Sequence, residues 1–323
     1  MNRRTLFSSA LVAFTLVAPV AAMADTVLRV GTFLAPVGVW HQPIQRFIDE
    51  VNARDAGIRL ELVADPSSVN PFQLGDAVSS GVIDIAYISG SFYTHLVPEA
   101  DALKNFNLPV QEVRANGALD LMDQIHRERM GAVFLGKIVD GIPLHIFTRR
   151  APESYDLSGF NLRGTPLYRP MMTGLGANVM QMPGGEIYAA VESGVIDGYG
   201  WPLWGIGDLG LLEVTNYRLE PGFYRSEIAL LANERRFDSL TEEQRAVLVE
   251  EAIEAENWFA DFLLEVNEAE IARQTEAGIE GISFAEEQAA DMLRMADEAA
   301  WAVIIENSPQ YGEQIRDLTY RAP

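Results

Sequence analysis

Two nearly identical octapeptides lie far apart in this chain: AVSSGVID spans residues 77–84 and AVESGVID spans residues 190–197. Each predicts the end of a helix, then a glycine, then the start of a buried strand. A helix often ends on a left-handed residue, which glycine adopts at low cost because it has no Cβ. The β-branched Val-Ile pair that follows favours a strand. The repetition indicates two similar α/β units, and the alternative is a chance repetition of common helix–strand junctions.

Strands and helices are predicted to alternate along the chain, which favours the α/β class. Alternating apolar residues predict strands at 27–33, 58–63, 132–135, 144–148, 160–163, 178–182 and 228–232. Helical spacing of apolar residues predicts helices at 43–52, 72–80, 111–130, 168–174, 186–193, about 240–277 and 285–307. A turn is expected at residues 139–143, and a capping pattern from Ser239 begins the longest helix.

Two lobes are predicted from the length of the chain and the order of its elements. A chain of 323 residues usually forms more than one domain. We assign residues 25–141 with 227–266 to lobe I, and residues 142–226 with 267–323 to lobe II. No Pro/Ser/Gly-rich linker separates them, so the chain is expected to cross between lobes more than once. The long helix would measure about 55 Å, which is enough to brace both lobes.

The N-terminus has the pattern of an export signal. Arg3 and Arg4 precede an apolar stretch, and Ala22-Met23-Ala24 fits a cleavage site, so residues 1–24 are expected to be removed after Ala24. A membrane anchor is the alternative, but the apolar stretch is shorter than the ~20 residues that a span needs. The predicted location is the periplasm, without stable membrane insertion.

The composition excludes several classes of site. The chain has no cysteine, which removes disulfides, thiolate catalysis and cysteine-bound metals. Its formal charge of −22 repels nucleic acid and anionic lipid. An anionic ligand would therefore need a local cationic site, and arginine supplies nearly all the positive charge, because Lys104 and Lys137 are the only lysines.

No catalytic, metal or cofactor site is predicted. The four histidines, His41, His95, His126 and His145, lack the spacing of metal ligands. The sequence has no Gly-x-Ser-x-Gly motif, phosphate loop or complete dinucleotide fingerprint. These observations favour a binding protein over an enzyme.

Arg163 is the strongest candidate for a binding residue. It ends a short predicted strand, where a guanidinium can hold a carboxylate through two parallel hydrogen bonds. A structural or surface arginine is an equal alternative on this pattern alone. Trp40, Trp201 and Phe92 also follow predicted strand ends, where ligands bind in open α/β sheets. These aromatic residues can wall a cleft, although ordinary packing explains any one of them.

The order and spacing of several short motifs resemble the solute receptors of tripartite ATP-independent periplasmic (TRAP) transporters, of the DctP type. The likeness covers nearly the whole predicted mature chain. It is carried by Leu28-Arg29-Val30-Gly31-Thr32, Gly81-x-x-Asp84, Pro98, Leu108-Pro109, Asp156-Leu157-x-Gly159-x-x-Leu162-Arg163, Leu175-Gly176-Ala177, Met182-Pro183, Glu186-x-Tyr188-x-Ala190, Gly194-Val195-x-Asp197-Gly198, Pro202, Glu213-Val214-x-x-Tyr217 and Asp238-Ser239-Leu240.

The resemblance implies a two-lobed, type II-like periplasmic binding protein with interlobe crossing strands and a long bracing helix. It implies a small organic acid held by Arg163, and delivery of that acid to the membrane permease of a sodium-driven importer. The protein is expected to be a monomer without a cofactor. The candidate ligand contacts are Arg163, Trp201, Trp40, Phe33, Ser89, Phe92, Tyr168 and Gly184.

The chain departs from the sialic-acid receptors of that family at four positions. Pro143 stands in place of a second arginine, Trp201 in place of an asparagine, Ser89 in place of an acidic residue and Phe92 in place of an arginine. The expected ligand is therefore a small monocarboxylate with an apolar or aromatic body. Two alternatives remain open: a ligand-sensing partner of a membrane receptor and, less favoured, an exported hydrolase.

Overall fold

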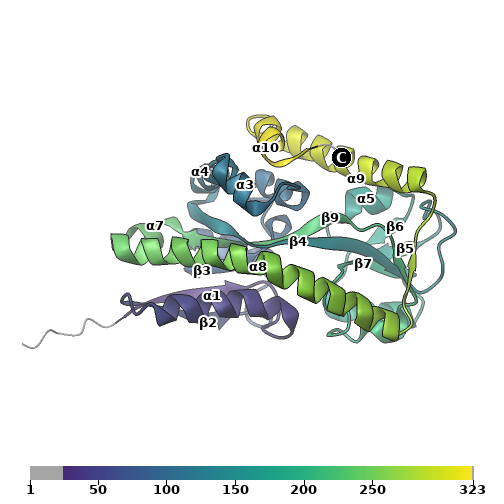
Figure 1. Cartoon of the computed structure of the whole chain (residues 1–323), viewed down its shortest axis with the longest axis horizontal. Coiled ribbons are helices and arrows are strands. Elements are labelled where there is room, and N and C mark those ends of the chain that lie inside the picture. The colour runs from purple at the N-terminus through teal and green to yellow at the C-terminus, as the bar shows by residue number, and fades with distance from the viewer. Residues whose placement is uncertain (1–24, 322–323) are drawn as a thin grey trace, which may run out of the picture.

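One mixed sheet runs through the whole molecule in this computed structural model, which describes residues 25–321 (Figure 1). The predicted signal peptide and its cleavage site lie outside the described residues. In spatial order the strands are β2 (Ile58–Ala64), β1 (Thr26–Thr32), β3 (Ile85–Ile88), β9 (Phe223–Asn233), β4 (Ala132–Thr148), β7 (Gly198–Pro202), β5 (Asn161–Arg163) and β6 (Asn178–Met180). The short β8 (Tyr217–Leu219) pairs with β4 and with β10 (Glu280–Ile282).

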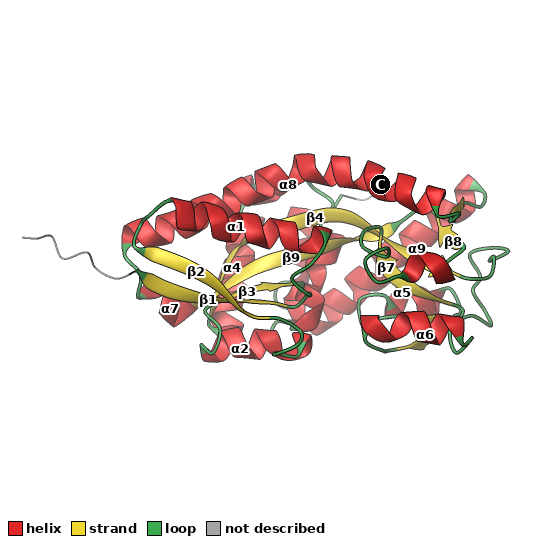
Figure 2. Cartoon of the chain, turned by 90° about the horizontal axis from the view of Figure 1, so that it is seen from below, coloured by secondary structure: helices red, strands yellow, loops and turns green. Residues whose placement is uncertain are grey.

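Helices cover the sheet on both sides, as Figure 2 shows. They are α1 (Gln42–Ala53), α2 (Leu74–Ser80), α3 (Val110–Ala115), α4 (Ala118–Met130), α5 (Arg169–Gly174), α6 (Ile187–Glu192), α7 (Glu234–Asp238), α8 (Glu242–Glu276), α9 (Glu286–Asn307) and α10 (Gly312–Thr319). Of the helices within residues 25–321, none has both the length and the apolar character that crossing a bilayer requires.

The long helix α8 lies along both halves of the sheet (Figures 1 and 2). Thr241 and Gln244 form a reciprocal capping box at its start. Its 35 residues span about 52 Å. The predicted bracing helix is therefore present. The single helix predicted at 111–130 is instead two helices, because Gly117 takes a left-handed φ of 85° between α3 and α4.

The strands β4 and β9 cross between the two halves of the sheet. The prediction of two strands separated by a turn at 139–143 is wrong, because β4 is continuous over 17 residues. Its pairing with β9 shifts register between Val139 and Ile142, and Gly141 there has a φ of 86°. The turn-like residues are therefore accommodated as an irregularity within a paired strand.

The strand directions bring the carboxyl ends of both halves to one place. β3 runs parallel to β1, and β7 runs parallel to β5. Three successive antiparallel pairings, β3 with β9, β9 with β4 and β4 with β7, make β7 run opposite to β3. Both strands therefore point toward the middle of the β4–β9 ribbon, where we expect a ligand.

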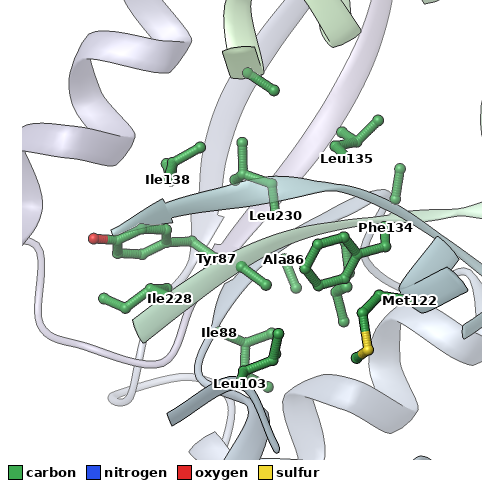
Figure 3. Close-up of a cluster of buried hydrophobic side chains, with 14 of the residues drawn as sticks. Ala86, Tyr87, Ile88, Leu103, Met122, Phe134, Leu135, Ile138, Ile228 and Leu230 are labelled. Atoms are coloured by element: carbon green, nitrogen blue, oxygen red, sulfur yellow. The ribbon is translucent and has the colours of Figure 1, made fainter. Parts of the chain in front are cut away.

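Separate hydrophobic cores support the two lobes. Figure 3 shows part of the first, in which Ile88 of β3 and Phe134 of β4 lie on one face of the sheet and Leu230 of β9 lies on the other. A second core contains Leu162, Met172 and Leu219, and a third contains Phe147 and Tyr199.

The C-terminal region contacts both lobes. Met292, Ala296 and Ala300 of α9 belong to the second core, whereas Trp301 and Ile304 belong to the first. The predicted assignment of residues 267–323 to lobe II alone is therefore wrong for the end of α9 and for α10, because their apolar side chains pack against lobe I.

The two octapeptides adopt the same local structure. Gly81 and Gly194 are both left-handed, with φ of 80° and 74°, as predicted. The following Val82 and Val195 are 59% and 51% exposed and lie outside any strand. The prediction that the strand starts at the Val-Ile pair is wrong, since β3 begins at Ile85 and β7 at Gly198.

The aspartate that ends each octapeptide explains why the strand starts only after it. Asp84 accepts a hydrogen bond from the backbone N–H of Arg29 (2.8 Å), and Asp197 accepts one from that of Asn161 (2.7 Å). The N–H of each aspartate donates to the carbonyl of the same partner residue. Each carboxylate thus links the start of one strand to its parallel neighbour, so the two octapeptides have the same structural role.

Candidate functional site

A cavity lies between the lobes where the strand ends converge. It has a wide chamber of about 710 Å³ and a second chamber of about 110 Å³, which we call the hinge-side chamber because the crossing strands β4 and β9 line it. Leu144 of β4 and Ser226 of β9 line the second. All eight predicted contacts line one or both chambers: Arg163, Trp201, Phe33 and Phe92 line both; Trp40, Ser89 and Tyr168 line the hinge-side chamber; Gly184 lines the wide chamber.

Arg163 enters the cavity from the end of β5 and is only 5% exposed. Its Nε donates to the carbonyl of Met182 (3.1 Å) and its Nη1 to that of Gly200 (3.2 Å). No carboxylate within residues 25–321 forms an ion pair with it. Burial lowers the pKa of Arg163, with a smaller opposing effect from Tyr168. The cation is therefore oriented by two carbonyls, and no acidic side chain of the described residues neutralises its charge.

Trp201 and Tyr168 offer further hydrogen-bond donors in the same region. Trp201 lies beside the guanidinium, with 5.2 Å between the ring centroid and Cζ of Arg163. Its Nε1 and the hydroxyl of Tyr168 are buried and have no hydrogen-bond partner in the part of the chain that the structure describes. Burial also raises the pKa of Tyr168, so this hydroxyl keeps its proton. A Cβ on Gly184 would lie 3.0 Å from the Trp201 ring, so glycine leaves room for the indole.

Lobe I supplies an aromatic wall. The rings of Phe33 and Phe92 are 4.9 Å apart, and Phe72 extends the contact at 4.8 Å from Phe92. Trp40 packs on Trp204 at 5.6 Å. This wall places apolar surface opposite Arg163 and favours a ligand with an apolar body.

Ser89 is connected to a carboxyl group that the sequence did not reveal. Its hydroxyl donates to Oε1 of Glu227 (2.8 Å), which also accepts from the N–H of Gly90 (2.8 Å). Glu227 is 2% exposed, and burial raises its pKa to about 8 against weaker opposing effects of these hydrogen bonds and of Lys137. An acidic residue directly before an apolar strand was the only sequence signal.

Several other lining residues were also missed. Thr165 and Ser91 each lie two residues beyond a predicted contact, which is the signal that could have found them. The remaining ones are Leu34, Ala35, Pro66, Asn70, Pro71, Phe72, Leu144, Leu167, Gln181, Met182, Pro183, Gly185, Pro202 and Ser226.

The histidines have other roles. His126 is enclosed in lobe I between Tyr93 and Met122, and burial lowers its pKa to about 4. His145 bonds the carbonyl of Leu219. None of the four lines the cavity. Between residues 25 and 321, no group of three or more His, Asp or Glu side chains could hold a metal ion.

Known proteins resemble this chain in sequence along nearly its full length. Residues 147–307 match the DctP family model, described as bacterial extracellular solute-binding protein, family 7. A solute-binding protein of Roseobacter denitrificans is 25% identical over 92% of this chain and 94% of its own. The 2,3-diketo-L-gulonate-binding periplasmic protein YiaO of Escherichia coli is 26% identical over 86% of each chain.

Solved structures share the fold. A TRAP periplasmic solute-binding protein of Desulfovibrio salexigens with bound orotic acid superposes with a TM-score of 0.80 at 20% identity, covering 91% of this chain and 97% of that one. A marine metagenome TRAP protein specific for aromatic acids, in complex with metahydroxyphenylacetate, gives 0.76 at 22% identity over 91% and 97%. The chain is therefore a DctP-type solute-binding protein with the two-lobed fold of TRAP receptors, and belongs to bacterial extracellular solute-binding protein family 7.

Proposed function

We propose that the protein captures a small organic acid between its lobes and delivers it to the permease of a TRAP importer. The observation that carries this proposal is the Arg163 cation, buried in the interlobe cavity without an acidic partner among the described residues. A buried charge is costly unless it is paired. A ligand carboxylate would supply the missing partner through charge-assisted hydrogen bonds.

The cavity favours a single carboxylate on a flat, apolar body. Within residues 25–321, Arg163 is the only Asp, Glu, Lys, Arg or His side chain that lines either chamber. A second carboxylate would therefore lack a charged partner. The aromatic wall suits a ring or a short hydrocarbon better than a polyhydroxylated chain. Orotic acid and metahydroxyphenylacetate, bound by two proteins of the same fold, are acids of suitable size for the first probes.

Capture would work through closure of the lobes. A ligand that contacts Arg163 of lobe II and Phe92 of lobe I stabilises the closed arrangement relative to the open one. The irregular middle of the β4–β9 ribbon, around Gly141, is the segment that we assign as the hinge. The protein acts as a monomer and releases its ligand chemically unchanged.

Calorimetry with matched acids and amides tests the proposal. Phenylacetate, 3-hydroxyphenylacetate and orotate are titrated into the protein, with phenylacetamide as the neutral control. We expect at least one acid to bind and the amide not to bind. Chromatography of the recovered acid tests for turnover, and sedimentation tests for the monomer. Binding of the amide as tightly as phenylacetate would contradict recognition of the carboxylate.

Delivery needs a separate assay. Uptake of the bound acid is measured in cells that express a TRAP permease with or without this receptor. Uptake that depends on the receptor supports transport. Binding without any receptor-dependent uptake favours the sensing alternative.

A further inference from the structure

We propose that the ligand carries a hydrogen-bond donor, a hydroxyl or N–H group, in addition to its carboxylate, and that Ser89 accepts this hydrogen bond. Glu227 is the positioning residue that imposes this preference, by orienting the Ser89 hydroxyl from behind the chamber wall. The inference rests on the proposed function and specifies the chemistry of its ligand.

The orientation of Ser89 follows from the contacts of Glu227. Oε1 of Glu227 receives the N–H of Gly90, which can only donate. The same oxygen lies 2.8 Å from Oγ of Ser89. Oε2 is buried and has no hydrogen-bond partner among residues 25–321, so a proton on this carboxyl would sit on Oε2 and leave Oε1 as the carbonyl oxygen. Oε1 is therefore an acceptor in either charge state, and the single hydrogen of the Ser89 hydroxyl points toward it.

What Ser89 presents to the chamber is therefore a lone pair. A serine hydroxyl has one hydrogen and two acceptor sites. Glu227 takes the hydrogen, and Ser91, with its Oγ 3.2 Å away, occupies at most one acceptor site by donating. Since Ser89 lines the hinge-side chamber, a remaining acceptor site is available to a ligand.

The opposite wall has the complementary character. Arg163 is a cationic donor, and Nε1 of Trp201 and the hydroxyl of Tyr168 are buried donors without partners among the described residues. All three belong to lobe II and line the same chamber as Ser89. Donors on lobe II and an acceptor on lobe I select a ligand that accepts at one end and donates at the other.

A ligand without the donor loses affinity for a physical reason. A fluorine, ether or N-methyl group at this place would set one lone pair or methyl group against the lone pair of Ser89. The buried Ser89 oxygen would then lose its water without gaining a partner. The loss corresponds to a roughly 10- to 100-fold weaker Kd.

Isothermal calorimetry on matched pairs tests the inference. The pairs are 3-hydroxyphenylacetate with 3-fluorophenylacetate, and pyroglutamate with N-methylpyroglutamate. In the wild type, we expect the donor-bearing member of each pair that binds to bind about 10- to 100-fold more tightly. Ser89→Ala should abolish this preference. Glu227→Gln keeps an acceptor oxygen for Gly90 and should preserve it, whereas Glu227→Met frees the Ser89 hydrogen and should reduce it.

A matched control comes from another serine bonded to a buried glutamate. Ser308 donates to Glu99 (2.6 Å), and both residues are buried away from the cavity. Ser308→Ala removes the same kind of bond and should leave the ligand preference of the wild type unchanged. If Glu227→Met does not fold, Ser89→Ala still decides the question.

The outcomes separate this inference from the proposed function. Equal affinity of the two members of a pair for the wild type, or a preference that survives Ser89→Ala, would overturn the inference and leave carboxylate capture intact. Loss of the preference in Glu227→Gln would overturn the assigned role of Oε1. Failure of every acid to bind would overturn both proposals.

Discussion

Replacing Arg163 with methionine should separate ligand binding from stability, because binding should be lost while the stability of the ligand-free protein is kept. In the free protein the buried guanidinium is held by two carbonyls and by the Trp201 ring. The desolvation of an unpaired cation costs several kcal/mol, and these contacts offset it only in part. Methionine removes both the cost and the contacts. We therefore expect the unfolding free energy of the ligand-free variant to stay within about 1 kcal/mol of the wild type, or to rise.

Ligand binding should fall sharply in the same variant. Removing one partner of a buried charge pair costs about 2–5 kcal/mol. An acid at 100 times its Kd stabilises the wild type by about 2.7 kcal/mol, which raises Tm by about 4 °C for a chain of about 300 residues. With about 3 kcal/mol of binding energy lost, the same concentration should raise Tm of the variant by less than about 1 °C.

Thermal shift assays with and without phenylacetate or orotate measure both quantities. Arg149→Met is the matched control, because Arg149 also donates to two carbonyls, those of Val191 and Glu192, but is exposed and does not line the cavity. It should keep the full ligand-induced shift. A ligand-free Arg163→Met protein that melts several degrees below the wild type would show that Arg163 is structural. A retained ligand-induced shift would refute its role in binding.

Three further predictions concern the buried Glu227, the cavity and the repeated octapeptides. Burial raises the pKa of Glu227 to about 8, so the stability that its protonated form contributes is fully present below the unfolded pKa and is lost as pH rises through 8. Between pH 6 and pH 9, the unfolding free energy of the wild type, measured in urea, should therefore fall by ~3 kcal/mol more than that of Glu227→Gln. Equal losses in the two proteins would contradict the raised pKa. Gly184→Ala should displace the Trp201 ring and weaken acid binding by about 10-fold in calorimetry. Gly185→Ala should leave acid binding unchanged, because its Cβ would meet no atom within 4 Å. Equal effects of the two substitutions would contradict the steric role of Gly184. Asp84→Asn and Asp197→Asn should each lower the unfolding free energy by about 1–3 kcal/mol because each loses a charge-assisted bond to a neighbouring strand, and urea midpoints equal to wild type would refute this role.

Local sequence signals predicted the outline of the fold because helix ends and buried strands depend on nearby residues. The left-handed Gly81 and Gly194 and the capping box at Thr241 are of this kind. The continuity of β4 could not be predicted from local signals, because Gly141 and its neighbours indicate a turn and only their pairing with β9 makes them part of a strand. Tertiary pairing decided that segment against its local preference.

The candidate site also contains residues that could be predicted from the sequence and one that depends on tertiary pairing. Strand-end position and the resemblance to TRAP receptors placed Arg163, Trp201 and the other six predicted residues at the cavity. Glu227 could not be found in this way, because it bonds Ser89, which lies 138 positions away in sequence. Only the pairing of β9 with β3 brings that carboxyl behind the chamber wall.

The lone cation of the cleft lies within a strongly anionic body. The net charge of −22 repels a free carboxylate that diffuses toward the molecule, until the carboxylate comes close to the guanidinium. Dissolved ions shorten the reach of that repulsion to about 10 Å at 0.1 M but leave the sheltered pairing inside nearly untouched. High ionic strength should therefore speed the association of an anionic ligand with this receptor, whereas low ionic strength should slow it.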